Sequence, residues 1–170
     1  FERNTQAGDC IVLTLVGCRG RFCPAGRSLG SAKIVVGVGG LRVVAGGDYN
    51  RCPDPTCAAF ELVPCFIFIS EATFGLPVFR HPPAREEIGK LIASIGVNAE
   101  RTHLIGAYAL GKAQRVIRLL RDAGYDAPIF LHGALLHLCD YYRSRGVELG
   151  TLLPATVDAR RDASAGQVVI

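Results

Sequence analysis

The sequence contains no methionine and no tryptophan, and it has no long apolar run. A membrane-spanning helix needs about 20 consecutive apolar residues, and no stretch of this chain approaches that length. The N-terminus also lacks the order of basic and then apolar residues that marks a secretory signal peptide. We therefore expect no membrane association and a cytoplasmic location. Since the chain starts at Phe1 and stops within the apolar run 166–170, we expect a piece of a longer protein, truncated at both ends.

Charge is sparse as well, with 20% of residues charged and 49% hydrophobic. This balance excludes a disordered chain and favours a globular protein with a real core. Lysine and arginine number 19 against 15 acidic residues, a mild excess that is compatible with a polyanionic partner. The seven cysteines are scattered and odd in number, which is untypical of a disulfide framework. Cys52, Cys57 and Cys65 fit a structural zinc site poorly, because such sites favour closer pairs and a fourth ligand.

The two halves of the chain carry different patterns. Short β-branched runs at 10–17, 32–38 and 41–46 predict strands, and Gly39-Gly40 predicts a hairpin between the last two. From Pro82 onward, helical and strand-like patterns alternate: helix 84–95, strand 102–107, helix 111–123, strand 128–131 and helix 134–145. This alternation predicts a parallel α/β layer. Residues 151–165 are polar and predict irregular structure.

Two carboxylates stand just after apolar runs. Asp48 follows the run 41–46, and Glu71 follows the run 66–69. Side chains that leave the carboxyl ends of strands converge in a crevice in many α/β proteins, so both are candidate site residues.

The sequence around these residues resembles the sequences of a known protein family. Segment 67–79, together with Gly47-Asp48-Tyr49 and 54–57, is similar to the β-CASP branch of the metallo-β-lactamase superfamily. Within that branch it most resembles the bacterial ligase-associated DNA exonucleases, which are related to mRNA 3′-end processing factors. The resemblance covers about residues 22–142. It implies an α/β fold: part of a metallo-β-lactamase αββα layer in 1–76, a parallel β-CASP α/β subdomain in 77–150, and a return segment toward the lactamase-like region in 151–170.

The resemblance implies a zinc-dependent nucleic-acid phosphodiesterase, of the exonuclease, DNA-repair or RNA 3′-end processing type. Asp48 matches the family's bridging metal ligand, and Glu71 matches an acidic residue that orients a histidine near the metals. Segment 23–32 matches a motif in which a histidine binds zinc, but Arg27 stands at that position. Arginine has no lone pair to give a metal. The family's His-x-His-x-Asp-His cluster is also absent, so we expect this chain to bind zinc weakly or not at all and to be inactive alone.

The expected partner is nucleic acid, either DNA or RNA, and the family association adds an ATP-dependent DNA ligase. Basic side chains recur every three residues through the helix predicted at 111–123, namely Lys112, Arg115, Arg118 and Arg121. The first three of these are our candidate phosphate contacts. The simpler alternative is a solvated helix surface.

Two further functions stay open. Arg27 is compatible with a noncatalytic relative that binds nucleic acid without cleaving it. Residues 106–113 fit the phosphate-binding loop Gly-x-x-x-x-Gly-Lys-[Ser/Thr] except at Ala113, which has no hydroxyl for a magnesium ion, and they suggest a nucleotide binder. Neither His132 nor His137 is assigned the role of the family's histidine signatures, and His132 is interpreted as a structural hydrogen-bonding residue.

Overall fold

The computed structural model describes residues 12–15, 18–155 and 166–170, and of 12–15 the backbone only. The chain divides into two compact units, Phe1–Phe79 and Arg80–Ile170, and each is described by itself. The domain limits expected from the sequence, including a return segment at 151–170, stay predictions.

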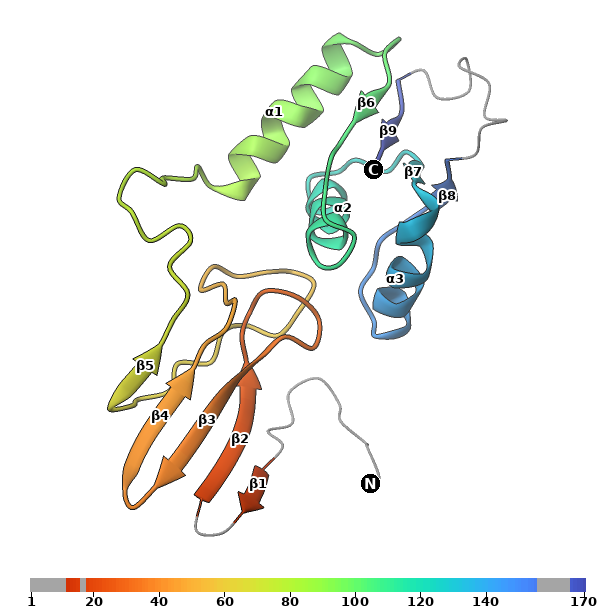
Figure 1. Cartoon of the computed structure of the whole chain (residues 1–170). Helices are drawn as coiled ribbons and strands as arrows, with labels where there is room; N and C mark the ends of the chain where they lie inside the picture. Colours follow the sequence, from red (N-terminus) through yellow and green to blue (C-terminus); the bar gives the residue numbers. More distant parts are fainter. Residues whose placement is uncertain (1–11, 16–17, 156–165) are drawn as a thin grey trace. The chain divides into compact units, whose positions relative to one another are not determined.

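The first unit is built on a five-stranded sheet in the order β1-β2-β3-β4-β5 (Figure 1). Its strands are β1 Val12–Leu15, β2 Cys18–Pro24, β3 Ala32–Val38, β4 Leu41–Ala45 and β5 Ile67–Ile69. Neighbours are antiparallel from β1 to β4, whereas β5 runs parallel to β4. Gly39 and Gly40, both with positive φ, make the turn of the β3–β4 hairpin, as the sequence predicts.

Alternation along the strands separates a covered face of this sheet from an open one. Cys23, Val35 and Val44 are buried and form one cluster with Val63. Lys33 shares their face and is 1% exposed. Its Nζ lies 3.6 Å from the centroid of the Phe60 ring, so an aromatic face covers the amine. On the opposite face, aliphatic side chains such as those of Ile34 and Val38 are about half exposed.

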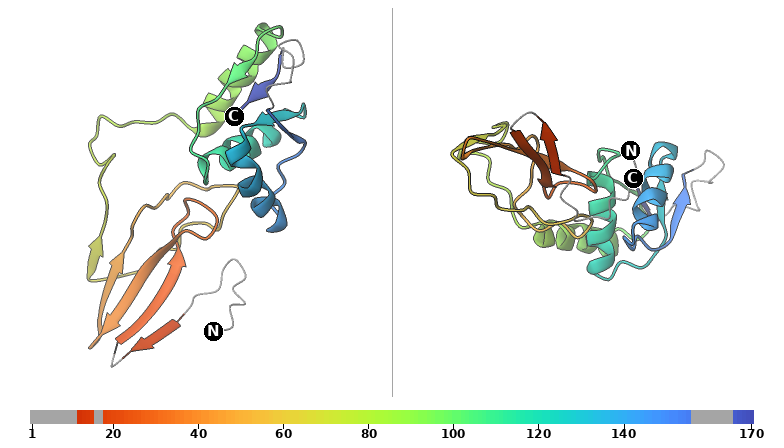
Figure 2. Two further views of the ribbon diagram at one scale, coloured as in Figure 1. Left: turned by 45° about the vertical axis from the view of Figure 1, so that its right-hand side comes forward. Right: turned by 90° about the horizontal axis from the view of Figure 1, so that it is seen from below.

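The second unit combines a four-stranded sheet with the three helices of the described chain (Figure 1 and Figure 2). The sheet order is β6-β9-β7-β8, and every pairing is parallel. The elements are α1 Ala84–Val97, β6 His103–Leu104, α2 Lys112–Asp122, β7 Ile129–Leu131, α3 Gly133–Ser144, β8 Leu152–Pro154 and β9 Val168–Val169. The predicted parallel α/β layer is therefore confirmed.

Fully buried side chains hold this second unit together. Ile117 and Leu120 of α2, Ile129 and Leu131 of β7 and Tyr142 of α3 are all 0% exposed. Helix α2 contacts both α1 and α3. This central position gives α2 one buried face and leaves the other for its polar residues.

Two strands differ from the sequence-based expectation. β8 lies within 151–165, where irregular structure was predicted, because its backbone extends the sheet beside β7 with Leu152 opposite Ile129. The sequence does not predict β2, because Arg19, Gly20 and Arg21 interrupt its apolar pattern. The segment becomes a strand through its pairing with β3. None of the helices in the described part of the chain has the length and apolar character that crossing a membrane requires.

Candidate functional site

Loops that follow strands of the first unit carry the candidate residues. Arg27 lies in the loop after β2, Asp48 after β4 and Glu71 after β5. The amide of Asn50 donates to the carbonyl of Ala25 at 2.9 Å, which ties the first two loops together. Gly26 permits this contact: its φ is +71°, and a Cβ there would lie 2.3 Å from the Asn50 carbonyl oxygen.

The loop contact brings Arg27 to Asp48. Nη1 of Arg27 forms an ion pair with Oδ2 of Asp48, and both side chains are about half exposed. Two of the positions that the sequence singles out are thus joined, although 21 residues separate them. The guanidinium lies against the carboxylate that the family resemblance assigns to metal binding.

Glu71 adds a second carboxylate near the same guanidinium. Hydrogen bonds from the backbone and side chain of Thr73 lower the pKa of the Glu71 carboxyl, and the positive charge of Arg27 lowers it further. The backbone bond is 2.7 Å long, from the Thr73 amide to Oε2 of Glu71. The loops of Asp48 and Glu71 also meet directly, since the hydroxyls of Tyr49 and Ser70 are 3.1 Å apart. Arg27 is therefore paired with Asp48, and its charge also acts on Glu71.

The basic residues of α2 differ strongly in their surroundings. Nε of Arg118 lies 2.9 Å from Asp122 and its Nη1 lies 3.3 Å from Glu148. These partners, Asp122 first, outweigh partial burial and raise the pKa of Arg118. Arg115 is half-buried, and Lys112 is exposed with its Nζ 5.1 Å from the centroid of the Tyr108 ring. A role in binding phosphates stays a prediction for all three, with Lys112 the most accessible.

Arg121 has a structural task that the sequence pattern did not indicate. Its guanidinium donates to four backbone carbonyl oxygens, those of Tyr125, Ala127, Leu149 and Thr151. Arg121 thereby fixes the segments that lead into β7 and β8.

Three amides at the end of the loop before α2 are not free to bind a phosphate. The amide of Gly111 donates to Oε1 of Gln114 at 2.7 Å. The next two amides, of Lys112 and Ala113, donate to carbonyl oxygens of the same loop at 3.1 Å. Phosphate-binding loops need such N–H groups pointing at the ligand. The geometry therefore argues against a nucleotide binder.

Gln114 is the residue of this loop that sequence reasoning missed. It is 0% exposed, and its Nε2 donates to the carbonyl oxygen of Ala109 at 2.9 Å and to Sγ of Cys139 at 3.6 Å. The sequence does offer one indication of this role. Gln114 lies at the third position of α2, from which a side chain can accept a hydrogen bond from the backbone N–H just before the helix.

The two histidines of this region differ in their surroundings. His132 precedes α3, and its Nδ1 accepts a hydrogen bond from the amide of Ala134 at 3.3 Å, so it caps the start of this helix. His137 is exposed on α3.

Comparison with known proteins identifies the family. The chain is 32% identical over 127 residues to Endoribonuclease YSH1 of Saccharomyces cerevisiae, covering 68% of this chain and 16% of that protein. It is 29% identical over 133 residues to the RNase J-like protein of Methanocaldococcus jannaschii, covering 73% and 32%. It is 28% identical over 130 residues to Cleavage and polyadenylation specificity factor 73 of Drosophila melanogaster, covering 70% and 19%. The chain belongs to the metallo-β-lactamase/β-CASP family.

This β-CASP chain spans about a third or less of the length of those relatives. No family model matches it. Among solved structures, a protein of unknown function from Enterococcus faecalis V583 has a similar fold. The TM-score is 0.52 at 11% identity, over 99% of this chain and 48% of the other. The mixed α/β fold expected for a β-CASP protein is thus confirmed.

A zinc centre of the kind the family resemblance implies does not fit the residues around Asp48. Its carboxylate is paired with a guanidinium, which cannot coordinate a metal and repels one. The ranges 12–15, 18–155 and 166–170 contain no group of three or more histidine, cysteine, aspartate or glutamate residues placed to hold a metal ion. Metal binding by Asp48 and the orienting role of Glu71 stay predictions, as does a DNA ligase partner.

Proposed function

We propose that this chain belongs to an RNA-processing protein and that it binds RNA without cleaving it. The ion pair between Arg27 and Asp48 carries the proposal, because it joins a fixed positive charge to the carboxylate that the family resemblance assigns to metal binding. The names of its relatives, endoribonucleases and a cleavage and polyadenylation specificity factor, support RNA as the partner.

The chemistry of the pair explains the lack of cleavage. Metal-dependent phosphodiesterases activate a water molecule by lowering its pKa at the metal. A guanidinium stays protonated at every useful pH and holds no water in that way. Beyond the N–H that bonds Asp48, it keeps further N–H donors, which can bind the oxygens of a phosphate. Arg27 is about half exposed, so a phosphate group can reach its guanidinium.

RNA binding should be weak and sensitive to salt. The net charge is only +4, and Arg118 is already paired with acidic residues. Each phosphate contact contributes about −0.7 to the slope of log affinity against log salt on a single strand. With Lys112 and one or two other contacts, we expect a slope of roughly −1.5 to −2.

A metal-dependent phosphodiesterase is the second candidate, favoured by the nuclease names of the relatives. It would require Arg27 to leave Asp48 so that the carboxylate becomes available to zinc.

One experiment separates the two. A 5′-labelled single-stranded RNA is incubated with the wild-type chain, Arg27→His and Asp48→Asn, with zinc, with manganese and with EDTA. Cleavage is followed on denaturing gels and binding by fluorescence anisotropy, with DNA of the same sequence as the comparison. We expect binding of RNA and no cleavage by the wild type. Cleavage that needs metal and disappears in Asp48→Asn would establish the nuclease instead, whereas tighter binding of the DNA would contradict the choice of RNA.

A further inference from the structure

A row of three residues crosses the sheet of the first unit near the β3–β4 hairpin. The strand register sets Arg19 of β2 opposite Gly37 of β3, and Gly37 opposite Arg42 of β4. Residues directly opposite one another in an antiparallel sheet point to the same face. Two arginines therefore leave one face of the sheet with a glycine between them.

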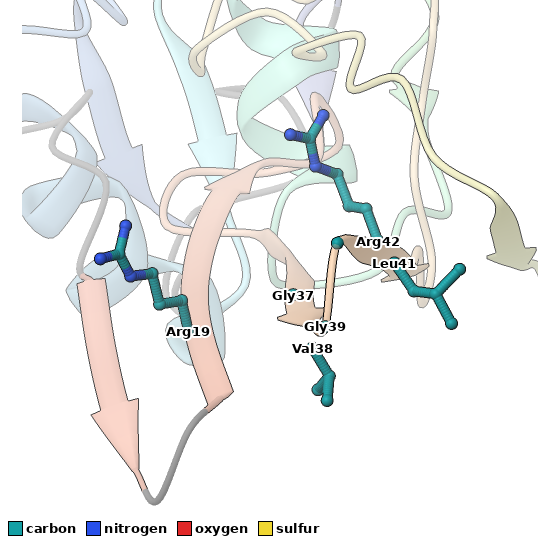
Figure 3. A pocket seen from close by; sticks show the side chains of 7 residues that line it. Arg19, Gly37, Val38, Gly39, Leu41 and Arg42 are labelled. Carbon is teal, nitrogen blue, oxygen red and sulfur yellow. The ribbon is translucent and has the colours of Figure 1, made fainter.

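A hollow lies at this place, where Gly37 contributes no side chain. The hollow has a volume of about 310 Å³ and is lined by Arg19, Arg42 and the hairpin 37–41 (Figure 3). Figure 3 shows the two arginine side chains leaving from either side of Gly37. No carboxylate is among the described residues that line it.

Neither arginine is neutralised within the described part of the chain. Nη1 of Arg42 donates to the carbonyl oxygen of Pro64 at 2.9 Å, which holds the guanidinium without cancelling its charge. Arg19 is exposed and makes no ion pair with a described residue. Arg21, two positions along the same strand, shows the contrast, since its Nη2 lies 2.9 Å from Glu61. The hollow is thus bordered by two positive charges that no described carboxylate pairs with.

The geometry points to a phosphate group as the ligand. Adjacent strands lie about 4.8 Å apart, so the Cα atoms of Arg19 and Arg42 are separated by roughly 10 Å, two strand spacings. A phosphate between them is within reach of two flexible arginine side chains, and guanidinium groups bind phosphate oxygens in pairs. We propose that Arg19 and Arg42 bind a phosphate group over Gly37. An RNA backbone and free inorganic phosphate share this chemistry, and the proposal stands whether or not the chain cleaves RNA.

Gly37 supplies a variant that keeps both charges and puts a side chain into the hollow. A Cβ at Gly37 would lie 3.8 Å from the carbonyl oxygens of Arg19 and Leu41, an ordinary contact. Gly37→Val therefore fits the strand, and valine favours β-structure. Arg51→Gln is the matched control, because Arg51 is an exposed arginine of the same unit that does not line the hollow.

The test is a titration of the ¹⁵N-labelled full chain at constant ionic strength. One arm uses inorganic phosphate and the other a short single-stranded RNA, and both follow the amide of Gly37 and the side-chain N–H signals of Arg19 and Arg42. We expect saturable shifts in at least one arm, with affinity about tenfold weaker in Arg19→Gln and Arg42→Gln, the loss expected for one charge-assisted hydrogen bond. Gly37→Val should weaken binding as well, and Arg51→Gln should leave it unchanged.

The two arms identify the source of the phosphate. Saturation by phosphate alone assigns the site to a small anion. Saturation by RNA assigns it to a single-stranded backbone, and RNA titrations repeated at several salt concentrations should then give a salt slope about 0.7 units shallower in the double arginine variant, because one phosphate contact is lost. Unmoved signals in both arms would overturn the proposal, as would an equal loss in Arg51→Gln. Circular dichroism of each variant verifies that the chain is folded.

Discussion

Replacing Gln114 by leucine should destabilise the second unit strongly. Leucine preserves most of the side-chain volume but removes the acceptor of the Gly111 amide and the donor to the Ala109 carbonyl. Gln114 is 0% exposed, so water cannot easily replace its side-chain amide. Leaving a buried backbone group unpaired costs about 1–3 kcal/mol. With two such groups and some relaxation of the loop, we expect a loss of about 2–4 kcal/mol in the free energy of unfolding.

Circular dichroism at 222 nm follows the unfolding of the second unit, because all the described helices lie in that unit. A domain of this size shifts its Tm by about 4–8 °C per kcal/mol, so the transition should move down by at least about 8 °C. Lys112→Leu is the control at an exposed position of the same helix and should change stability by no more than about 0.5 kcal/mol. A Gln114→Leu protein as stable as the wild type would refute the view that this side chain closes the loop before α2.

Two further predictions concern basic side chains. Arg121→Met should lower the free energy of unfolding by about 2–4 kcal/mol, because four carbonyl oxygens lose their donor, and an unchanged urea midpoint would contradict that role. Burial lowers the pKa of Lys33 from its ordinary value of 10.5, so the unfolded chain binds a proton that the folded chain releases. Stability should therefore rise with pH between the folded pKa and 10.5, and this rise should be missing from Lys33→Met in urea titrations at several alkaline pH values. Equal pH slopes in the two proteins would contradict the assignment.

The strands and helices with strong apolar periodicity could be predicted from sequence. The hairpin at Gly39 and Gly40 and the alternation from 84 to 145 follow from local patterns, and the structure confirms both. β2 and β8 are different, because their strand conformation depends on pairing with β3 and β7. Local propensity carries little information about such tertiary pairing.

The candidate site could be predicted only in part from the sequence. The residue type at Arg27 is visible in the sequence, but its ion pair with Asp48 depends on the packing of Gly26 against Asn50. Gln114 looks like an ordinary polar helix residue until the loop before it is in place. The row of Arg19, Gly37 and Arg42 cannot be predicted from the sequence, because only the strand register aligns the three residues.

Zinc content tests most directly the central claim that a guanidinium stands in place of a metal at Asp48. The purified chain is equilibrated with zinc, dialysed and subjected to elemental analysis, in parallel with Arg27→His and Asp48→Ala. We predict much less than one tightly held zinc ion per wild-type chain, because Arg27 neutralises the carboxylate and repels a cation. Two tightly held zinc ions in the wild type, lost in Asp48→Ala, would contradict the account.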